Sequence, residues 1–465
     1  MPSTYLPVQE PARTVPVAFE CDLCVIGGSC TGVFAAVRAA RMGLSVALVE
    51  QNSIFGGMAT AAQVNDWHSL LDAHEETQII GGLTLEVLNR LRTRNAVQDR
   101  RRRDRGPYFV FNSAELALEL DALVSEHSIR PFLRAACVGA IRQGNRLDAA
   151  ILEDKSGRRA IRARIFIDAS GDGDLLRRAG FQAWQNDMLQ PVTYQALIAG
   201  LAAVQKDKEL WTQLLPHVHR YPYPTENSRP WVNSCGFPGD LNNVYAPRLN
   251  GVDASDADQL TRALLESRRC HRVLLQMARQ ELDSQAACVG LAQAMGVRET
   301  WHARCLHQVR VEELLSGKRF SDAIAFGTYP VDVHSPQGTL LRHLDGREEL
   351  VAKDGTISWK RWRDESQPCT PYYQIPYRCL IPKEADNLLV AGRLLDADRE
   401  AFGGLRVMVN MNQTGEAAGT AASLALKNQC TTAEIDTALL RQTMAEFGSL
   451  FPTEKRATVV ALSGT

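Results

Sequence analysis

Apolar residues near the start of the chain follow two patterns that differ in period. Residues 23–26 form a short, continuous apolar stretch typical of a buried parallel strand, and residues 33–42 are rich in alanine, which indicates a helix. Gly43 ends this helix, and a second apolar stretch at residues 46–49 predicts another buried strand. The order of strand, helix and strand predicts a βαβ unit.

A glycine-rich turn from Gly27 to Gly32 joins the first strand to the helix. Gly27 permits a tight turn, Gly32 lets the helix lie close to the strand, and free amides at the helix start can bind a pyrophosphate. Ser29 occupies the middle position, where glycine is usual, and its hydroxyl could donate to a phosphate oxygen. Glu50 follows 18 residues after Gly32, and its carboxylate can accept hydrogen bonds from both hydroxyls of an adenosine ribose. The segment predicts a dinucleotide site, with a nucleotide-free Rossmann-like fold as the alternative.

Helices and strands also alternate in the following part of the chain. Helices are expected at residues 83–92 and from Ser113 onward, and a strand is expected near residues 134–141. Residues 146–154 and 160–167 predict the two arms of a hairpin. These elements extend the first unit.

The pattern changes between residues 183 and 369, which predicts a separate substrate lobe. A helix is expected at about residues 255–282, and residues 323–333 resemble a strand. The last third returns to the first pattern, with a buried strand at residues 387–393 and a helix rich in small residues at 415–427.

Composition excludes several classes of protein. The chain has 465 residues, 45% hydrophobic and 23% charged, enough for two or three lobes with large cores. Its net charge of -1 gives no basic field for nucleic acid, and the arginine-rich residues 100–105 are expected to form a solvated loop. The amino terminus lacks a signal peptide core, and no apolar stretch is long enough to span a membrane. We therefore expect a cytoplasmic protein without a nucleic-acid partner or a membrane span.

Eleven cysteines are scattered without regular spacing, which predicts reduced thiols. Cys21 and Cys24 form a CxxC pair, but they lie at the first strand instead of a helix start, so packing is their expected role. Cysteines and histidines lack the spacing of a zinc site, so no metal is predicted.

Three separated blocks, at residues 27–57, 168–174 and 387–422, together resemble the FAD-dependent oxidoreductases of the two-dinucleotide-binding-domain group. This group is distantly similar to the fumarate reductase and succinate dehydrogenase flavoproteins. The resemblance includes GVRET at residues 296–300, YPVDVH at 329–334 and YQIPYRCLIP at 373–382.

The resemblance implies an α/β fold: a Rossmann-like FAD-binding domain of the glutathione-reductase type with an inserted α+β substrate domain. The expected division is a flexible segment at residues 1–19, the first part of the FAD-binding domain at 20–182, the substrate or cap domain at 183–369, and the second part of the FAD-binding domain with a carboxyl-terminal helix at 370–465.

The resemblance also implies which residues contact FAD. The glycine turn would hold the pyrophosphate, Glu50 the ribose, residues 56–59 the isoalloxazine and the Val138 backbone the adenine, while Gly392 and Arg393, with Asp396 or Asp398, would reach the ribityl chain and pyrophosphate. The full set is Gly27, Gly28, Ser29, Cys30, Thr31, Gly32, Glu50, Gln51, Gly56, Gly57, Met58, Ala59, Val138, Ala169, Ser170, Gly171, Asp172, Gly392, Arg393, Thr414 and Gly415.

Thr414 and Gly415 are expected to open a helix whose positive end faces the flavin N1 and C2 carbonyl. The alternative is an ordinary packing helix. No histidine occurs at residues 51–55, so covalent attachment of the flavin is not expected.

Candidate catalytic residues lie near the lobe boundary. His334 ends a predicted strand and is the candidate proton carrier, with a structural role as the alternative; His302 is a weaker candidate. Arg406 could hold a substrate carboxylate or a polyhydroxylated anion; the alternative is an ion pair with Glu400 or Asp398. Further candidates are Tyr377, Arg378, and Arg298 with Glu299; the alternative role for each of them is to join the two lobes.

We expect an FAD-dependent oxidoreductase that transfers a hydride between flavin N5 and a small polar organic substrate. No second dinucleotide motif is present, so electrons could pass to a separate acceptor. This absence motivates the alternative, a flavoprotein subunit that exchanges electrons with a protein partner.

Overall fold

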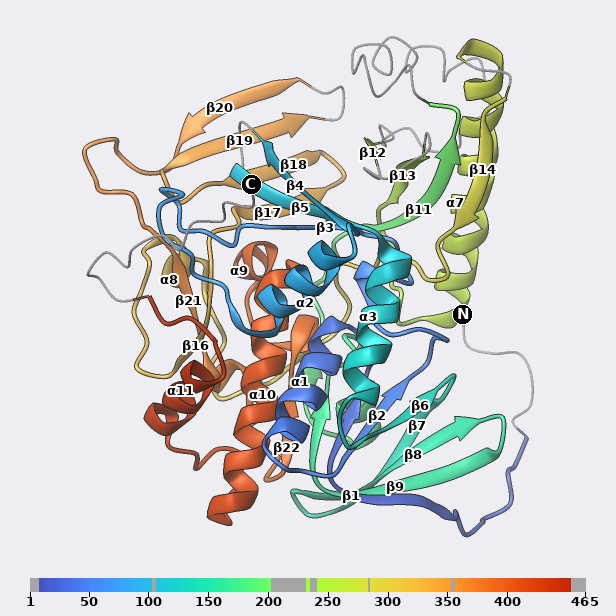
Figure 1. Ribbon diagram of the computed structural model, residues 1–465, viewed down its shortest axis with the longest axis vertical. Helices are drawn as coiled ribbons and strands as arrows, with labels where there is room; N and C mark the ends of the chain where they lie inside the picture. Colours follow the sequence, from blue (N-terminus) through green and yellow to red (C-terminus); the bar gives the residue numbers. More distant parts are fainter. Residues whose placement is uncertain are drawn as a thin grey trace.

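The computed structural model describes residues 8–102, 106–201, 231–234, 241–282, 285–352 and 356–452. A seven-stranded sheet forms its core, in the lower half of Figure 1, with strand order β6-β2-β1-β9-β8-β7 and β22 paired to β9. The parallel strands are β1 (Val17–Ile26), β2 (Val46–Glu50), β6 (Ile129–Leu133), β9 (Gly157–Asp168) and β22 (Leu388–Val390), and the antiparallel ones are β7 (Ala136–Gln143) and β8 (Arg146–Asp154). This sheet confirms the α/β class and the Rossmann-like core.

The last four residues of strand β1, residues 23–26, are buried on both faces, as expected for a parallel strand. Leu23 and Val25 pack into the core that also contains helices α1 (Cys30–Arg41) and α10 (Met408–Asn428), while Cys24 faces a second core on the other side. Cys21 and Cys24 are free thiols, and burial raises the pKa of Cys21 to about 12. The two cysteines therefore have the packing role expected of them.

Helices α1 and α10 pack tightly because glycines face the contact, as the adjacent ribbons in Figure 1 show. A Cβ at Gly415 would overlap the carbonyl oxygen of Thr31, and one at Gly419 would overlap that of Ala35. Helix α10, from the last part of the chain, is thus held directly against the first βαβ unit.

A buried ion pair between Arg38 of α1 and Glu416 of α10 joins the same helices. Glu416 also accepts a hydrogen bond from the amide of Leu83 at 3.0 Å, at the start of α2 (Gly82–Thr93). One carboxylate therefore fixes three helices in this part of the core.

Three further sheets lie above this core in Figure 1. A four-stranded sheet, β12-β13-β11-β14, has the long helix α7 beside it; another consists of β17 to β20, and a three-stranded sheet has the order β3-β5-β4. Two-stranded sheets join β10 to β15 and β16 to β21.

The bounds of these strands are β3 (Asp66–His68), β4 (Val97–Arg102), β5 (Gly106–Phe111), β10 (Ala183–Trp184), β11 (Val192–Ala199), β12 (Trp231–Ser234), β13 (Leu241–Leu249), β14 (Ala287–Leu291), β15 (His302–Ala303), β16 (Ala323–Gly327), β17 (Val331–Ser335), β18 (Gly338–Arg342), β19 (Arg347–Ala352), β20 (Ile357–Arg361) and β21 (Tyr373–Pro376). The remaining helices are α3 (Ser113–Ser125), α4 (Asp174–Arg178), α7 (Ala257–Glu281), α8 (Val311–Leu315), α9 (Arg399–Leu405) and α11 (Thr437–Glu446), with short 3-10 turns η1 (Gly57–Ala59), η3 (Tyr377–Leu380) and η4 (Gly392–Leu394). No helix among the described residues is both long enough and apolar enough to cross a bilayer.

Several elements differ from the sequence predictions. Residues 323–333 form two strands, β16 and β17, which are separated at residues 328–330 and pair with different partners, β21 and β18. Part of the arginine-rich segment predicted as a loop is strand β4, which pairs with β5; residues 103–105 lie outside the described residues. Strand β1 begins at Val17, within the segment expected to be flexible, of which residues 1–7 also lie outside the described residues.

Candidate functional site

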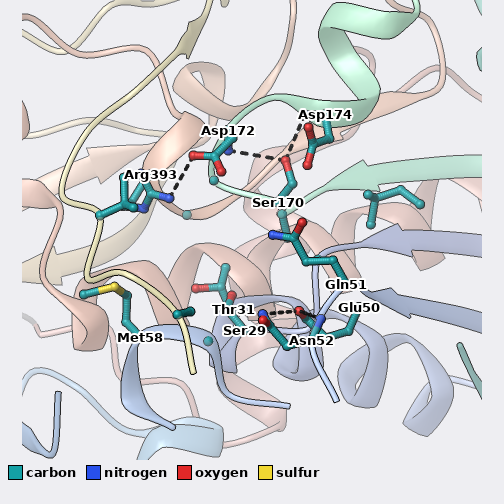
Figure 2. Close-up of a pocket in the computed structure, with 18 of the residues that line it drawn as sticks. Ser29, Thr31, Glu50, Gln51, Asn52, Met58, Ser170, Asp172, Asp174 and Arg393 are labelled. Atoms are coloured by element: carbon teal, nitrogen blue, oxygen red, sulfur yellow. Dashed lines mark hydrogen bonds and ion pairs between the residues drawn. The ribbon is translucent and has the colours of Figure 1, made fainter. Parts of the chain in front are cut away.

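A cavity of about 420 Å³, called here the main cavity, lies where the parallel strands end (Figure 2). Its wall includes Gly27 after β1, Glu50 at the end of β2, Ala169 after β9 and Gly392 after β22. The carboxyl ends of parallel strands are where open α/β sheets bind their ligands. The expected residues that line it are Gly27, Ser29, Cys30, Thr31, Glu50, Gln51, Gly56, Gly57, Met58, Val138, Ala169, Ser170, Gly171, Asp172, Gly392 and Arg393.

The glycine turn brings backbone amides to the cavity wall. Gly27 has a positive φ of 100°, and a Cβ there would overlap the carbonyl oxygen of Ala169. Helix α1 begins after Ser29 without a side-chain cap or an acidic residue in its first turn. Its first amides have no partner within the helix, and the positive end of its dipole is not compensated. This arrangement suits a phosphate group.

Glu50 is buried and already holds part of its hydrogen-bonding capacity. One carboxylate oxygen accepts from the Gly28 amide at 2.7 Å, and the other accepts from the Asn52 amide and side chain at 2.7 and 2.6 Å. Burial raises the pKa of Glu50, although these donors act against the rise. A carboxylate has about four acceptor sites. The structure therefore leaves about one site on Glu50, fewer than the two ribose hydroxyls expected from the sequence.

Five residues of the expected set do not line the main cavity: Gly28, Gly32, Ala59, Thr414 and Gly415. Gly28 and Gly32 pack closely against Phe55 and the carbonyl oxygen of Gly27, and Ala59 is fully buried. These residues therefore stabilise the cavity wall by packing, although they do not line the cavity themselves.

Helix α10 corrects the prediction about Thr414 and Gly415. The helix begins at Met408, so both residues lie inside it and not at its amino end. Thr414 accepts a hydrogen bond from the Gly392 amide at 3.0 Å, and Gly415 packs on α1. The first turn of α10 nevertheless faces the main cavity through Met408 and Met411.

The turn after β9 is held by the buried side chain of Asp168. Its carboxylate accepts hydrogen bonds from the amide and hydroxyl of Ser170 and from the amides of Leu175 and Leu176. Nearby, Asp174 lines the main cavity, and burial together with the charges of Asp172 and Asp168 raises its pKa to about 6. This turn places one carboxylate of raised pKa in the cavity wall.

Arg393 spans the cavity wall and pairs with Asp172 at 3.2 Å (Figure 2). Its Nη1 atom is buried and has no hydrogen-bond partner in the described part of the chain. Such a donor calls for an acceptor on a ligand, since a buried donor left unpaired costs about 1–3 kcal/mol.

A second cavity of about 140 Å³, called here the chamber, adjoins the main cavity. The two share the wall residues Met58, Val297, Arg393, Arg406 and Met408. The chamber is also lined by Val64, Asp66, Trp67, His68, Arg298, Tyr329, Val407 and Val409. A molecule in the chamber would therefore lie next to a ligand of the main cavity.

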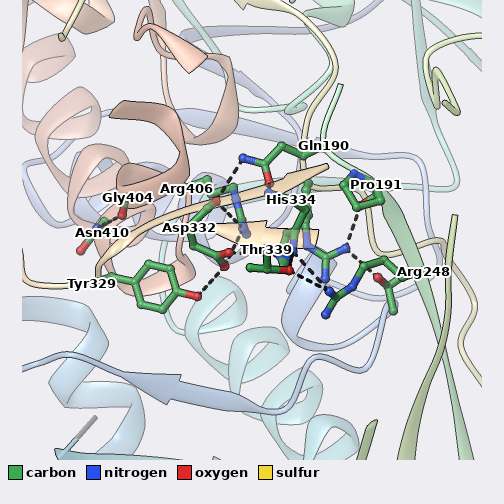
Figure 3. Close-up of polar contacts among 12 residues, drawn as sticks. Gln190, Pro191, Arg248, Tyr329, Asp332, His334, Thr339, Gly404, Arg406 and Asn410 are labelled. Atoms are coloured by element: carbon green, nitrogen blue, oxygen red, sulfur yellow. Dashed lines mark hydrogen bonds and ion pairs between the residues drawn. The ribbon is translucent and has the colours of Figure 1, made fainter. Parts of the chain in front are cut away.

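Behind the chamber, a buried network is centred on Asp332 (Figure 3). The Asp332 carboxylate pairs with Arg406 at 3.0 Å and with His334 Nε2 at 3.3 Å, and it accepts the Tyr329 hydroxyl at 2.7 Å. His334 Nδ1 lies 2.8 Å from the Thr339 hydroxyl and 3.3 Å from Arg248 Nη1. Tyr329 and Arg406 are the members of this group that line the chamber.

Burial and neighbouring charges shift the pKa values of this network. Burial would raise the pKa of Asp332, but the charge of Arg406 and the hydrogen bonds from His334 and Tyr329 outweigh burial and hold that pKa well below its usual value. Burial lowers the pKa of His334 to about 3, so the imidazole is neutral at neutral pH. Burial, with Arg248 and Arg406 nearby, lowers the pKa of Arg298 to about 9.

The structure changes the predictions for two residues at the lobe boundary, His334 and Arg406. His334 is buried and lines neither cavity, and among the described residues it is linked to the chamber through Asp332, which contacts both Tyr329 and Arg406. Arg406 pairs with Asp332, and neither of the partners considered from the sequence is used: Glu400 pairs with Arg342, and Asp398 caps α9.

Tyr377 and Arg378 also line neither cavity. The buried Tyr377 hydroxyl donates to the Thr432 carbonyl at 2.8 Å, and Arg378 forms an ion pair with Asp322 at 2.9 Å. Both side chains are used in packing contacts, so the structure does not support a catalytic role for them.

His302, Glu299 and Asp396 also take part in buried packing contacts. Glu299 and His302 are fully buried and bond to each other at 3.2 Å, and His302 stacks on Trp184. Asp396 accepts hydrogen bonds from the Cys305 amide at 2.9 Å and from the Trp184 side chain at 3.1 Å. None of the three lines either cavity.

The sequence predictions missed several residues of the main cavity, among them Asn52, Gln293, Met295, Met411 and Asn412. Asn52 lies two residues after Glu50, and residues 293–295 directly precede the GVRET segment. Their positions in the sequence could therefore have indicated that they belong to the site. Met411 and Asn412 were missed because the sequence predicts the start of this helix at Thr414, whereas α10 begins at Met408.

The parallel sheet, the open glycine turn and the carboxylate at the end of β2 define a dinucleotide-binding protein. The sequence profile described as FAD dependent oxidoreductase matches residues 22–444. The chain therefore belongs to the FAD dependent oxidoreductase family; it is an enzyme, and its cofactor is FAD.

Solved structures with a similar fold have low sequence identity to this chain. A geranylgeranyl bacteriochlorophyll reductase-like protein from Thermoplasma acidophilum is 11% identical with a TM-score of 0.45, covering 96% of this chain and 94% of that one. A flavoprotein/dehydrogenase from Cytophaga hutchinsonii is 12% identical with a TM-score of 0.43, covering 92% and 84%. The p-nitrophenol 4-monooxygenase PnpA from Pseudomonas putida DLL-E4 is 9% identical with a TM-score of 0.42, covering 92% and 84%. A search of curated proteins found no match.

Proposed function

We propose that this enzyme transfers a hydride between FAD in the main cavity and a small polar organic substrate in the chamber. The observation that carries the proposal is the wall shared by the two cavities, which includes Met58, Arg393 and Arg406. FAD, when bound, supplies the group that accepts or donates the hydride.

The main cavity fits a dinucleotide in three ways. The uncapped start of α1 and the unpartnered Nη1 of Arg393 would hold the pyrophosphate, and the remaining acceptor site of Glu50 would hold a ribose hydroxyl. The Val138 backbone would face the adenine, and residues 56–58 would lie beside the flavin ring. We further propose the glutathione-reductase-like type for this domain, and residues 183–369 as the substrate domain; the β7–β8 hairpin before β9 supports the former.

In the chamber, the chain would position the substrate and limit the access of water. Val64, Trp67 and Val409 contribute apolar wall, while the Tyr329 hydroxyl and the Arg406 guanidinium contribute polar groups. Tyr329 lines the chamber, and its hydroxyl contacts Asp332, which in turn contacts His334. We propose that this hydroxyl exchanges a proton with the substrate, with Asp332 holding its orientation.

Anaerobic reduction of the purified, FAD-loaded enzyme tests the proposal. We expect at least one small metabolite from a panel of hydroxy acids, amines, sugars and unsaturated acids to change the flavin spectrum between its oxidised and reduced forms without a second protein. A spectral change that needs a protein partner would favour the electron-transfer subunit instead. A protein that retains no FAD would contradict both functions.

A further inference from the structure

We infer that the chamber binds a substrate through a carboxylate group, and that Arg298 is the cation that receives it. This inference rests on the proposed function and narrows its substrate class. It depends on the charge balance of the chamber, on the free donors of one arginine and on the geometry of those donors.

Positive charge around the chamber exceeds what its buried acids compensate. Arg393 pairs with Asp172 and Arg406 pairs with Asp332. Within the described residues, Arg298 forms no ion pair with any carboxylate. Arg248, which lies against His334, forms none there either (Figure 3). His334 adds no charge at neutral pH, because burial lowers its pKa to about 3.

The donors of Arg298 are only partly used. Its Nη1 donates to the Pro191 carbonyl at 2.7 Å and to the Thr193 hydroxyl at 2.6 Å, which fixes the side chain on β11. In the described part of the chain, its Nε and Nη2 have no hydrogen-bond acceptor. An anchored arginine therefore lines the chamber with its Nε–Nη2 edge unused.

This edge matches a carboxylate in shape and charge. Two parallel N–H donors of a guanidinium bind the two oxygens of a carboxylate, and such charge-assisted pairs are stronger than neutral hydrogen bonds. Burial and the other arginines lower the pKa of Arg298 to about 9, so a neighbouring anion would also stabilise its charged form.

Asp66 limits the charge of the anion. It lines the same chamber and carries a negative charge, as does Asp332 behind the wall. A singly charged carboxylate satisfies Arg298, whereas a doubly charged phosphate would meet repulsion from both acids. The chamber therefore favours a monocarboxylate over phosphate.

Binding of small anions to the FAD-loaded enzyme tests the inference without catalysis. Acetate and glycolate would be titrated beside their neutral amides, acetamide and glycolamide, with inorganic phosphate as a further probe, and the visible spectrum of the bound flavin would report binding. We expect the carboxylates to perturb the spectrum at lower concentrations than the amides or phosphate. Equal binding of amides, tighter binding of phosphate, or no binding of either carboxylate would overturn the inference.

Substitution of Arg298 adds the residue-level test. Arg298→Gln should weaken acetate binding about 10- to 100-fold, in line with a charge-assisted hydrogen bond of about 1.5–3 kcal/mol, and leave the FAD content unchanged. Arg378→Gln is the matched control, because Arg378 lines neither cavity. Unchanged acetate binding in Arg298→Gln would refute the role of this residue, and the comparison of acetate with acetamide decides the inference even if the variant fails to fold.

The two proposals fail in different ways. If the enzyme binds FAD and is reduced only by neutral substrates, the carboxylate inference is wrong and the proposed function stands. If no small molecule reduces bound FAD, while acetate still binds through Arg298, the proposed function is wrong and the anion site stands.

Discussion

The main cavity and the chamber share a wall, yet they are built from different parts of the chain. The wall of the main cavity includes the glycine turns that follow strands β1, β9 and β22. The chamber is lined by residues from distant segments, among them the charged residues Asp66 and Arg298. Backbone sites depend on local conformation, whereas a side-chain site depends on how separate elements meet. The cofactor site and the substrate site therefore depend on different parts of the structure: the cofactor site on turns of the fold, and the substrate site on particular side chains.

The largest expected effect comes from adding one methyl group to the glycine turn. Gly27→Ala would place a Cβ against the Ala169 carbonyl in the centre of the sheet, so we expect loss of bound FAD and several kcal/mol of stability. Gly43→Ala is the matched control, because Gly43 also has a positive φ, of 90°, but no atom lies within 4 Å of its added Cβ. Absorbance of the purified proteins and urea unfolding measure both quantities. A Gly27→Ala protein with a full complement of FAD would show that close backbone approach does not build the main cavity.

A charge change in the network behind the chamber should affect stability more than cofactor binding. Asp332→Asn removes the carboxylate that compensates Arg406, and an uncompensated buried charge costs about 3–5 kcal/mol. Urea unfolding should show this loss, while the folded protein keeps its FAD. Asp345→Asn, which removes an exposed partner of Arg347, should cost at most about 1 kcal/mol. Equal stabilities of the two variants would mean that Asp332 does not hold the arginines together.

The same contrast explains which features could be predicted from the sequence. Gly27 and Glu50 lie within one βαβ unit, so the period of the apolar residues and the glycine spacing predict their positions. Arg406 and Asp332 are far apart in sequence, and nothing local indicates that they pair; the sequence suggested Glu400 or Asp398 because they are near. The start of α10 was missed because Val409, Asn410 and Asn412 are weak helix formers, and packing outweighs this preference.

A milder change at the main cavity should weaken FAD binding without loss of the fold. Glu50→Gln replaces a carboxylate that accepts from Gly28 and Asn52 by an amide with a single acceptor oxygen, so one of these contacts is lost. We expect FAD affinity to fall about 10- to 100-fold, corresponding to about 1.5–3 kcal/mol. Glu153→Gln, at an exposed ion pair with Arg158, serves as the control. Fluorescence titration of the FAD-free proteins measures the affinities, and equal values would remove Glu50 from the cofactor site.

The smallest expected effect is a change in how stability depends on pH, and it concerns His334. Its folded-state pKa of about 3 lies below the usual value of 6.5, so the unfolded chain binds the proton more readily than the folded one. Stability must therefore fall as the pH falls below about 6.5, and this one residue should remove about 1.4 kcal/mol between about pH 7.5 and about pH 5.5.

His334→Gln should lose this part of the pH dependence while its side chain can still bond to Thr339. Urea unfolding of both proteins at the two pH values measures the difference, in which the contributions of all other groups cancel. If the two proteins show the same pH dependence, His334 is not held neutral by burial. Enzyme turnover then separates two roles for His334. If His334 carries the proton, its substitution should remove most of the activity. If it only positions Asp332, the variant should retain much of the activity, because Tyr329 is the residue of this network that contacts Asp332 and lines the chamber.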